Sequence, residues 1–206
     1  MSRPNSIAMA VFWFCLIAFG QGILSGPVHA GSPQKAEKAY QQARKAYYLF
    51  KADKKKQKLR HHWQKTAAGF ERVAEQYKKS ARAADALFTA GRLYYDLFGI
   101  SRVEADLDKA VEHFERLVNE FPANGLADDG QLYIALQYLE YRKNKVAAAA
   151  ALARLVERFP KGDCRPRAKR MLEDLGGPPS DRQGVKADAS FAGWGKPKQE
   201  DASSGE

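Results

Sequence analysis

Apolar residues recur at helical spacing along most of the chain, from Ser32 to Leu175. Positions three and four apart lie together on a helix surface, so each such stripe forms one apolar face. No stretch in this region alternates apolar and polar residues as a half-buried strand would. The clearest stripes are Tyr40, Ala43, Ala46, Tyr47 and Phe50; Ala110, Phe114, Leu117, Val118 and Phe121; and Val146, Ala150, Leu155, Val156 and Phe159. The pattern predicts an all-α protein whose helices cover one another's apolar faces.

Polar breaks divide this pattern into seven helices. The breaks read "YKKS", "LFGIS", "FPANG", "RKN" and "FPKGD", and they contain the residue types that end helices. Asp106 is expected to cap the start of the fourth helix. The predicted helices span 33–50, 57–78, 81–97, 106–121, 126–142, 146–159 and 164–175. Short connections would make these into three hairpins and a last single helix, which is the plan of a helical-hairpin solenoid.

One sequence pattern occurs three times, as "FERVAEQYKKSARAAD" at 70–85, "FERLVNEFPANGLADD" at 114–129 and "LARLVERFPKGDCRPR" at 152–167. The stretch 84–122 resembles a tetratricopeptide repeat (TPR). Ala90 and Gly91 supply the small residues at which helices approach closely, Tyr94 and Phe114 supply aromatic filling, and Pro122 follows the second helix. The segment "LFGISRVEADLD" departs from the family by predicting a turn about seven residues longer than usual.

The TPR resemblance implies a binding groove on the first helices of the hairpins. In that family the second, fifth, ninth and twelfth positions of the first helix face the groove. The corresponding residues here are Asp85, Phe88, Arg92 and Tyr95 in one repeat, and Asp129, Leu132, Leu136 and Leu139 in the next. Arg92 would offer a fixed cation to a carboxylate. The alternative is that Phe88 and Tyr95 are core residues of an irregular repeat.

The two ends of the chain are expected to lie outside the helical domain. The apolar run "IAMAVFWFCLIAFG" at 7–20, followed by "PVHAG", is typical of a signal peptide cleaved after Ala30. A membrane span is the alternative, but it needs about 20 apolar residues. Residues 176–206 are rich in Gly, Pro and Ser, which indicates a disordered tail or linker. The predicted organisation is a signal peptide at 1–30, a TPR-like domain at 31–175 and a tail at 176–206, in a soluble periplasmic protein.

A finer resemblance covers nearly the whole mature chain. The stretches "AYQQARKAYY", "RHHWQKTAAGFERVAEQY", "FPANGLADD" and "RFPKGDCRPRAK" are similar to the amino-terminal region of bacterial periplasmic N-acetylmuramoyl-L-alanine amidases. In that family this region precedes a zinc-dependent domain, which cuts the amide bond between the glycan and the stem peptide of peptidoglycan. The zinc-dependent domain has no counterpart in the sequence, and 176–206 resembles the start of the linker that would lead to it.

The residues of the chain do not predict catalysis. A zinc site needs several ligands around one metal, and only His61, His62 and His113 remain after signal removal. His61 and His62 are neighbours on a helix and are expected to diverge. Cys164 would be left without a disulfide partner, and is expected to be a small half-buried residue; activation of its thiol at a helix start is the alternative. We expect no catalytic residues, no metal and no cofactor.

Charge indicates which partners the chain attracts. Lys and Arg outnumber Asp and Glu 34 to 24, and "KADKKKQKLR" at 51–60 concentrates this excess. Such a patch attracts anionic lipid or the acidic stem peptides of peptidoglycan, whereas export disfavours nucleic acid. A solvated turn is the alternative. The predicted basic patch is Lys51, Lys54, Lys55, Lys56, Lys58 and Arg60.

Two functions follow from these observations. The first is a non-enzymatic periplasmic scaffold that binds a protein, a peptide or a cell-wall partner. The second is the targeting or regulatory part of a zinc amidase, either split from its catalytic partner or a truncated product.

Overall fold

The structure is a computed structural model that describes residues 32–178. The predicted signal peptide and nearly all of the predicted tail lie outside these residues. Within them the chain forms seven α-helices and no strand, so the all-α prediction is confirmed. The helices are α1 (Pro33–Ala52), α2 (Arg60–Gln76), α3 (Ala81–Ser101), α4 (Glu104–Glu120), α5 (Ala127–Glu140), α6 (Lys145–Arg158) and α7 (Arg165–Asp174), with a short 3₁₀ turn at Lys56–Lys58.

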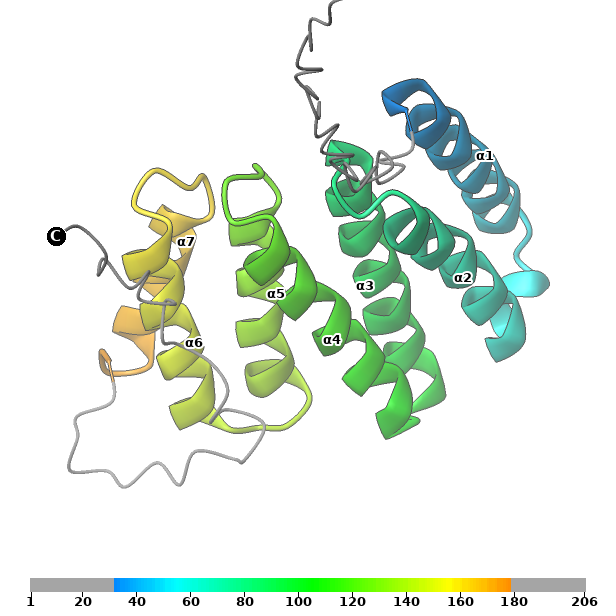
Figure 1. The fold of residues 1–206 in the computed structure, drawn as a ribbon. Helices are drawn as coiled ribbons and strands as arrows, with labels where there is room; N and C mark the ends of the chain where they lie inside the picture. Colours follow the sequence, from blue (N-terminus) through cyan, green and yellow to red (C-terminus); the bar gives the residue numbers. More distant parts are fainter. Residues whose placement is uncertain (1–31, 179–206) are drawn as a thin grey trace, which may run out of the picture.

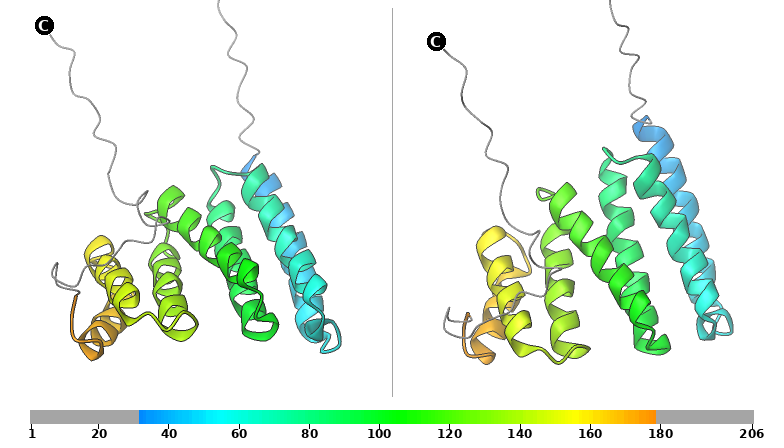
Figure 2. Two further views of the ribbon diagram at one scale, coloured as in Figure 1. Left: turned by 90° about the horizontal axis from the view of Figure 1, so that it is seen from below. Right: turned by 60° about the horizontal axis from the view of Figure 1, so that its bottom comes forward.

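The helices stack as hairpins in chain order (Figure 1). Each helix packs on the next, and α1 also contacts α3. Figure 2 shows the pairs side by side along one axis, with α1 and α2 at one end and α7 at the other. This arrangement is a helical-hairpin solenoid, as the repeats predicted. None of the helices at 32–178 has the length and apolar character to span a membrane.

The core runs through the whole stack and is built from large side chains set against small ones. Phe70, Phe114 and Leu117 are almost completely buried. Gly91 lies against the Phe114 ring so closely that a Cβ atom would come within 2.8 Å of it. A glycine is therefore required where α3 meets α4, because any larger residue would displace a buried ring.

The long turn predicted between the third and fourth helices is wrong. Helix α3 continues to Ser101 and α4 begins at Glu104, so the connection is only Arg102 and Val103. Arg102 takes the left-handed conformation, with φ of 54°, that ends α3. The helix continues because Leu97 and Phe98 are buried in the core, while Ile100 is exposed and Gly99 and Ser101 are half-buried in its last turn.

The predicted capping role of Asp106 is also wrong. Asp106 lies in the first turn of α4, is 1% exposed and accepts two hydrogen bonds from the Arg60 guanidinium, at 2.6 and 2.8 Å. The Ser101 hydroxyl donates a third, at 2.7 Å. Burial alone would raise the pKa of Asp106, but these hydrogen bonds outweigh it and hold the pKa below its ordinary value. The ion pair of Arg60 with Asp106 therefore links the start of α2 to the start of α4.

Candidate functional site

A pocket of about 200 Å³ opens between α1 and α3, on the first helices of two hairpins. Most of its wall is aromatic. The residues that line it are Tyr40, Arg44, Tyr47 and Tyr48 from α1, Phe70 from α2, and Phe88, Thr89, Arg92, Leu93 and Asp96 from α3. We call this surface, together with Tyr133 of α5, the aromatic groove.

Helical spacing brings these side chains to one face. Tyr40, Arg44 and Tyr47 follow one another at intervals of four and three along α1, as do Phe88, Arg92 and Asp96 at intervals of four along α3. Ser32 accepts a hydrogen bond from the Lys35 backbone and, with Pro33, starts α1. The side chain of Ser80 caps α3 in the same way. Both walls of the groove are therefore set by well-defined helix starts.

Ring contacts extend the wall from α3 to α5. The Tyr133 ring meets Phe88 edge to face, with centroids 6.0 Å apart, and stacks on Phe114 at 4.9 Å. Tyr40 packs edge to face on Phe70 at 5.8 Å. Packing of this kind favours fixed ring positions, so the groove presents a continuous and pre-formed aromatic surface.

Two arginines lie in this groove without a carboxylate partner among the described residues. The Arg44 guanidinium lies 5.4 Å from the centre of the Tyr48 ring, and its Nε donates to the Tyr48 hydroxyl at 3.3 Å. The Arg92 guanidinium lies 5.3 Å from the centre of the Tyr133 ring. Within residues 32–178, no ion pair within 4.0 Å involves either arginine. Rings hold both cations in place, and one Arg44 Nη also donates to Gln41 Oε1 at 3.5 Å. The other Arg44 Nη and the Arg92 guanidinium are the donors that a ligand carboxylate would meet.

One acid balances part of this charge. Burial raises the pKa of Asp96, while Arg92 and Lys51 act against that rise. An acidic side chain on the groove floor discourages a ligand carboxylate there and favours one nearer to Arg44 or Arg92. The groove is thus electrostatically uneven along its length.

The comparisons with known proteins bear on the helices that build this surface. Segments 85–124 and 129–162 match the tetratricopeptide repeat family. These two TPR segments coincide with the α3–α4 and α5–α6 hairpins, and TPR hairpins are typical of protein-interaction scaffolds. The α1–α2 hairpin lies outside the matched segments. No curated protein and no solved structure matched the chain.

The structure places the first set of predicted groove residues in different environments. Phe88 and Arg92 line the aromatic groove. Asp85 does not line the groove; it is half-buried and accepts a hydrogen bond from Arg82 of the same helix. Tyr95 is buried, and its hydroxyl donates to Glu140 Oε2 at 2.7 Å, so Tyr95 is a core residue, which was the alternative open for it.

No member of the second predicted set lines the aromatic groove. Leu132 and Leu136 are buried in the core and offer no exposed surface, and Leu139 packs half-buried beside them. Tyr133, one position after Leu132, makes the contacts with Phe88 and Arg92. Asp129 is half-buried and accepts a hydrogen bond from the Cys164 thiol at 3.4 Å. Burial of Leu132 and Leu136 in the core leaves the neighbouring Tyr133 to contact the groove residues.

The residues on α1 were missed, although the sequence carries a signal for them. The segment "YQQARKAYYLF" at 40–50 repeats "FTAGRLYYDLF" at 88–98, which puts Arg44 and Arg92 at the same position. This likeness lies in the first helix of each hairpin, whereas the pattern at 70–85, 114–129 and 152–167 begins in the second helix of each hairpin. The first helices therefore carry the signal that pairs Arg44 with Arg92.

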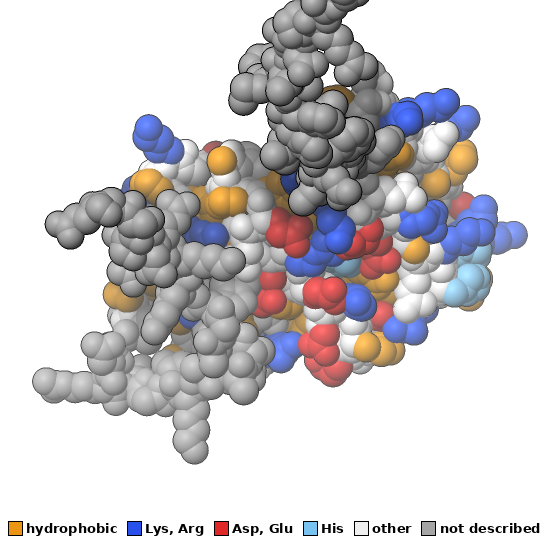
Figure 3. Space-filling model, in the orientation of Figure 1, with side chains coloured by type: hydrophobic (Ala, Val, Ile, Leu, Met, Phe, Trp, Pro, Cys, Tyr) orange, Lys and Arg blue, Asp and Glu red, His pale blue; other side chains and the backbone are white. Residues whose placement is uncertain are grey.

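The predicted basic patch divides into structural and exposed residues. Arg60 belongs to the pair with Asp106, Lys51 lies 5.4 Å from the Trp63 ring centre, and Lys56 pairs with an aspartate in the same turn at 3.0 Å. No ion pair within 4.0 Å is found, among the described residues, for the remaining members, which are exposed, as Lys56 and Arg60 are: Lys54, Lys55 and Lys58. In Figure 3, Lys, Arg and His side chains gather at the α1–α2 end of the molecule, whereas Asp and Glu lie over α4.

Of the three histidines, His113 is buried in the helix packing, whereas His61 is exposed and His62 is half-buried. His61 and His62 do not diverge as predicted; their ring centres lie 4.1 Å apart. His113 is buried, with Nε2 2.9 Å from Glu71 Oε1 and its ring stacked on Tyr94. These contacts join α4 to α2 and α3.

One group of potential metal ligands occurs at residues 32–178, formed by Asp128, Asp163 and Cys164. Asp128 Oδ2 already accepts a hydrogen bond from the Cys164 backbone N–H at 3.0 Å, which holds the start of α7. Burial, with Asp129 nearby, raises the pKa of the Cys164 thiol to about 12. The thiol is therefore protonated at neutral pH, which disfavours both metal binding and the activated state considered for it.

Proposed function

We propose that the protein is a non-enzymatic adaptor of the bacterial periplasm, which binds a carboxylate-bearing peptide or protein segment in the aromatic groove. The TPR match supports the scaffold role, and the apolar run followed by "PVHAG" supports export. The partner is recognised on the first helices of the hairpins, without metal or cofactor.

The observation that carries this proposal is the pair of ring-held arginines. Arg44 and Arg92 lie on contacting helices and line the same pocket. Among the described residues neither forms an ion pair within 4.0 Å, although Asp96 lies close enough to Arg92 to offset part of its charge. A carboxylate that bridges them would gain two charge-assisted contacts, while its neighbouring apolar groups would pack on Tyr47 and Phe88. The net charge of +10 would also raise the rate at which acidic partners approach.

The second candidate function is the targeting part of a peptidoglycan amidase. It is favoured by the resemblance over "AYQQARKAYY" and "RFPKGDCRPRAK", and by the acidic stem peptides that peptidoglycan carries. In this case the groove would hold the chain on its substrate or on a catalytic partner. A zinc amidase encoded directly downstream that co-purifies with this chain would favour this candidate.

Calorimetry with an acidic peptide and with a soluble peptidoglycan fragment tests the main proposal. Arg92→Ala should weaken binding by about 1 to 3 kcal/mol, because one charge-assisted contact is lost, and should leave the melting temperature nearly unchanged. Arg170→Ala is the matched control, because Arg170 is an exposed arginine of α7. Unchanged affinity in Arg92→Ala, or an equal loss in Arg170→Ala, would contradict the assignment.

A further inference from the structure

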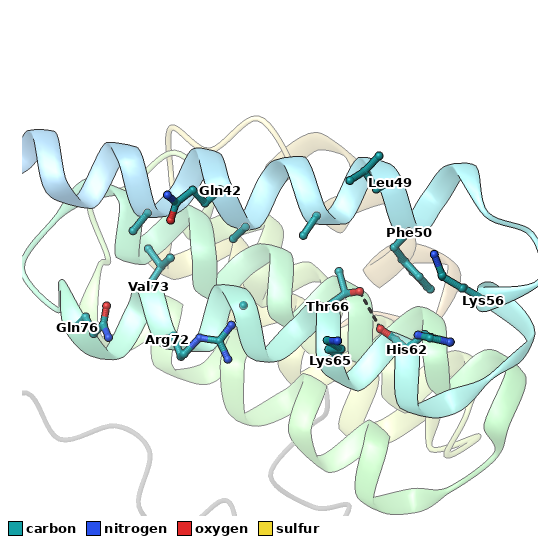
Figure 4. Close-up of a pocket in the computed structure, with 14 residues that line it drawn as sticks. Gln42, Leu49, Phe50, Lys56, His62, Lys65, Thr66, Arg72, Val73 and Gln76 are labelled. Atoms are coloured by element: carbon teal, nitrogen blue, oxygen red, sulfur yellow. Dashed lines mark hydrogen bonds between the residues drawn. The ribbon is translucent and has the colours of Figure 1, made fainter.

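A second hollow, of about 490 Å³, lies between α1 and α2 at the end of the stack. Figure 4 looks onto it with α1 above, α2 below and the other helices behind, so it opens away from the solenoid. Its middle is lined by short side chains, Ala39, Ala43 and Ala46 from α1, and by Gly69 from α2. It follows about three turns of α1, which is room for a helix to lie along it. We call this hollow the end trough.

The equivalent surface of the next hairpin is covered by a helix. Phe70, Glu71 and Arg72 occupy the same repeat position as Phe114, Glu115 and Arg116. On the α3–α4 hairpin, α2 covers this surface and supplies carboxylates to it. Glu75 pairs with Arg116 at 2.6 Å, and Glu71 lies 2.9 Å from the imidazole of His113. The stack itself therefore shows what covers this face: a helix that carries glutamates.

Arg72 in the end trough has the same repeat position as Arg116 on the surface of the α3–α4 hairpin that α2 covers. It is exposed, and no carboxylate lies within 4.0 Å of it in the part of the chain that the structure describes. Lys65 lines the same wall, one helical turn from Gly69. The lining includes no Asp or Glu. Figure 4 shows Arg72 and Lys65 on α2 beside the hollow.

We propose that the end trough docks an amphipathic helix of a partner protein, with a Glu or Asp side chain placed opposite Arg72 and Lys65. The alanines and Gly69 let the partner backbone approach closely, and the cations fix its direction and position. This surface is separate from the aromatic groove, so the inference does not rest on the function proposed for that groove.

Other occupants match the trough less well. Residues 1–31 contain no Asp or Glu, so the segment that precedes α1 has no carboxylate for Arg72. Residues 179–206 carry Gly and Pro at short intervals, which disfavours a helix of three turns. A second copy stacked end to end would bring α7, with its exposed Arg167, Lys169 and Arg170, against another cationic surface.

The test uses two designed helical peptides of about 20 residues, long enough to span the trough. Both carry one stripe of Leu; one has Glu on both flanks of the stripe and the other has Lys. Fluorescence anisotropy with the full chain should show binding of the Glu peptide and not of the Lys peptide. The variant with Lys65→Glu and Arg72→Glu should bind the Glu peptide at least about tenfold more weakly and should bind the Lys peptide instead. Ala46→Trp, which fills the trough, should abolish binding of either peptide.

The matched control carries Lys169→Glu and Arg170→Glu on α7, which changes the net charge equally and should leave binding unchanged. Thermal melting by circular dichroism confirms that each variant is folded. The proposal is overturned if the Glu peptide fails to bind, or if the α7 control weakens it equally. It is also overturned if sedimentation shows a dimer of the chain that Ala46→Trp dissociates, because a second copy would then be the occupant.

Discussion

The first two hairpins are built on the same pattern but have different surroundings. On the α3–α4 hairpin, α2 covers the outer surface, and Asp106 and Arg116 there form ion pairs with Arg60 and Glu75 of α2. On the α1–α2 hairpin the equivalent surface is open, the residues in its middle are small, and Arg72 has no ion pair among the described residues. Repeat position alone therefore does not decide whether a charge is structural or available to a partner. The neighbouring helix decides it.

The largest expected change in stability is at Asp106, on the surface of the α3–α4 hairpin that α2 covers. Asp106→Ala should lower the free energy of unfolding by about 3 kcal/mol, the low end for breaking a buried ion pair, because Arg60 stays partly hydrated. His62→Ala, at the equivalent place on α2, should change it little. Urea unfolding of both variants checks this. Equal losses of free energy would show that the covered surface of α3–α4 and the open surface of α1–α2 do not differ in energetic importance.

The same carboxylate gives a pH dependence with a definite sign. Its folded pKa lies below the ordinary 3.8, so its contribution to stability is complete above about pH 4 and is lost as the pH falls through the lowered pKa. Asp106→Asn should therefore flatten the loss of stability as the pH falls below about pH 4. An unchanged acid profile would mean that other groups control acid unfolding.

The same change, glycine to alanine, should have opposite effects on stability at Gly91 of α3 and at Gly69 of α2. Gly91→Ala should destabilise the protein by about 1 to 2 kcal/mol, because its Cβ would meet the Phe114 ring at 2.8 Å. Gly69→Ala should stabilise it by up to about 1 kcal/mol, because the nearest atom is Ala43 Cβ at 3.7 Å and alanine favours the helix. Calorimetric melting should give opposite signs; a shared sign would refute the difference in packing.

The smallest expected stability difference concerns the equivalent arginines. Arg116→Ala removes contacts with Glu75 and Glu120 and should cost up to about 1 kcal/mol. Arg72→Ala should stay within about 0.5 kcal/mol of the parent, as for other surface substitutions. If chemical denaturation shows Arg72→Ala to be the more costly of the two, Arg72 has a structural role that its surroundings do not reveal.

The sequence predicted the helices well because strong apolar stripes and helix-ending residues agree. It failed at the connection between α3 and α4, where "LFGIS" resembles a break and only tertiary packing of Phe98 shows that the helix continues. Two residues of the groove, Phe88 and Arg92, were predictable, since they lie in the repeat with the best match. Tyr133 was missed because repeat position points to Leu132, and only the packing of α5 shows that Leu132 is buried. The ion pair of Arg60 with Asp106 joins residues too far apart in sequence for periodicity to reveal.

The central claim is that a carboxylate-bearing partner binds in the aromatic groove. A titration of the isotopically labelled protein with an acidic peptide, followed by backbone amide resonances in NMR, tests it most directly. The account predicts shifts at Arg44, Thr89 and Tyr133, from three helices that are apart in sequence, and little change along α4 and α6. Shifts confined to Lys65, Gly69 and Arg72 would place this partner in the end trough instead, and shifts confined to α4 or α6 would contradict the groove altogether.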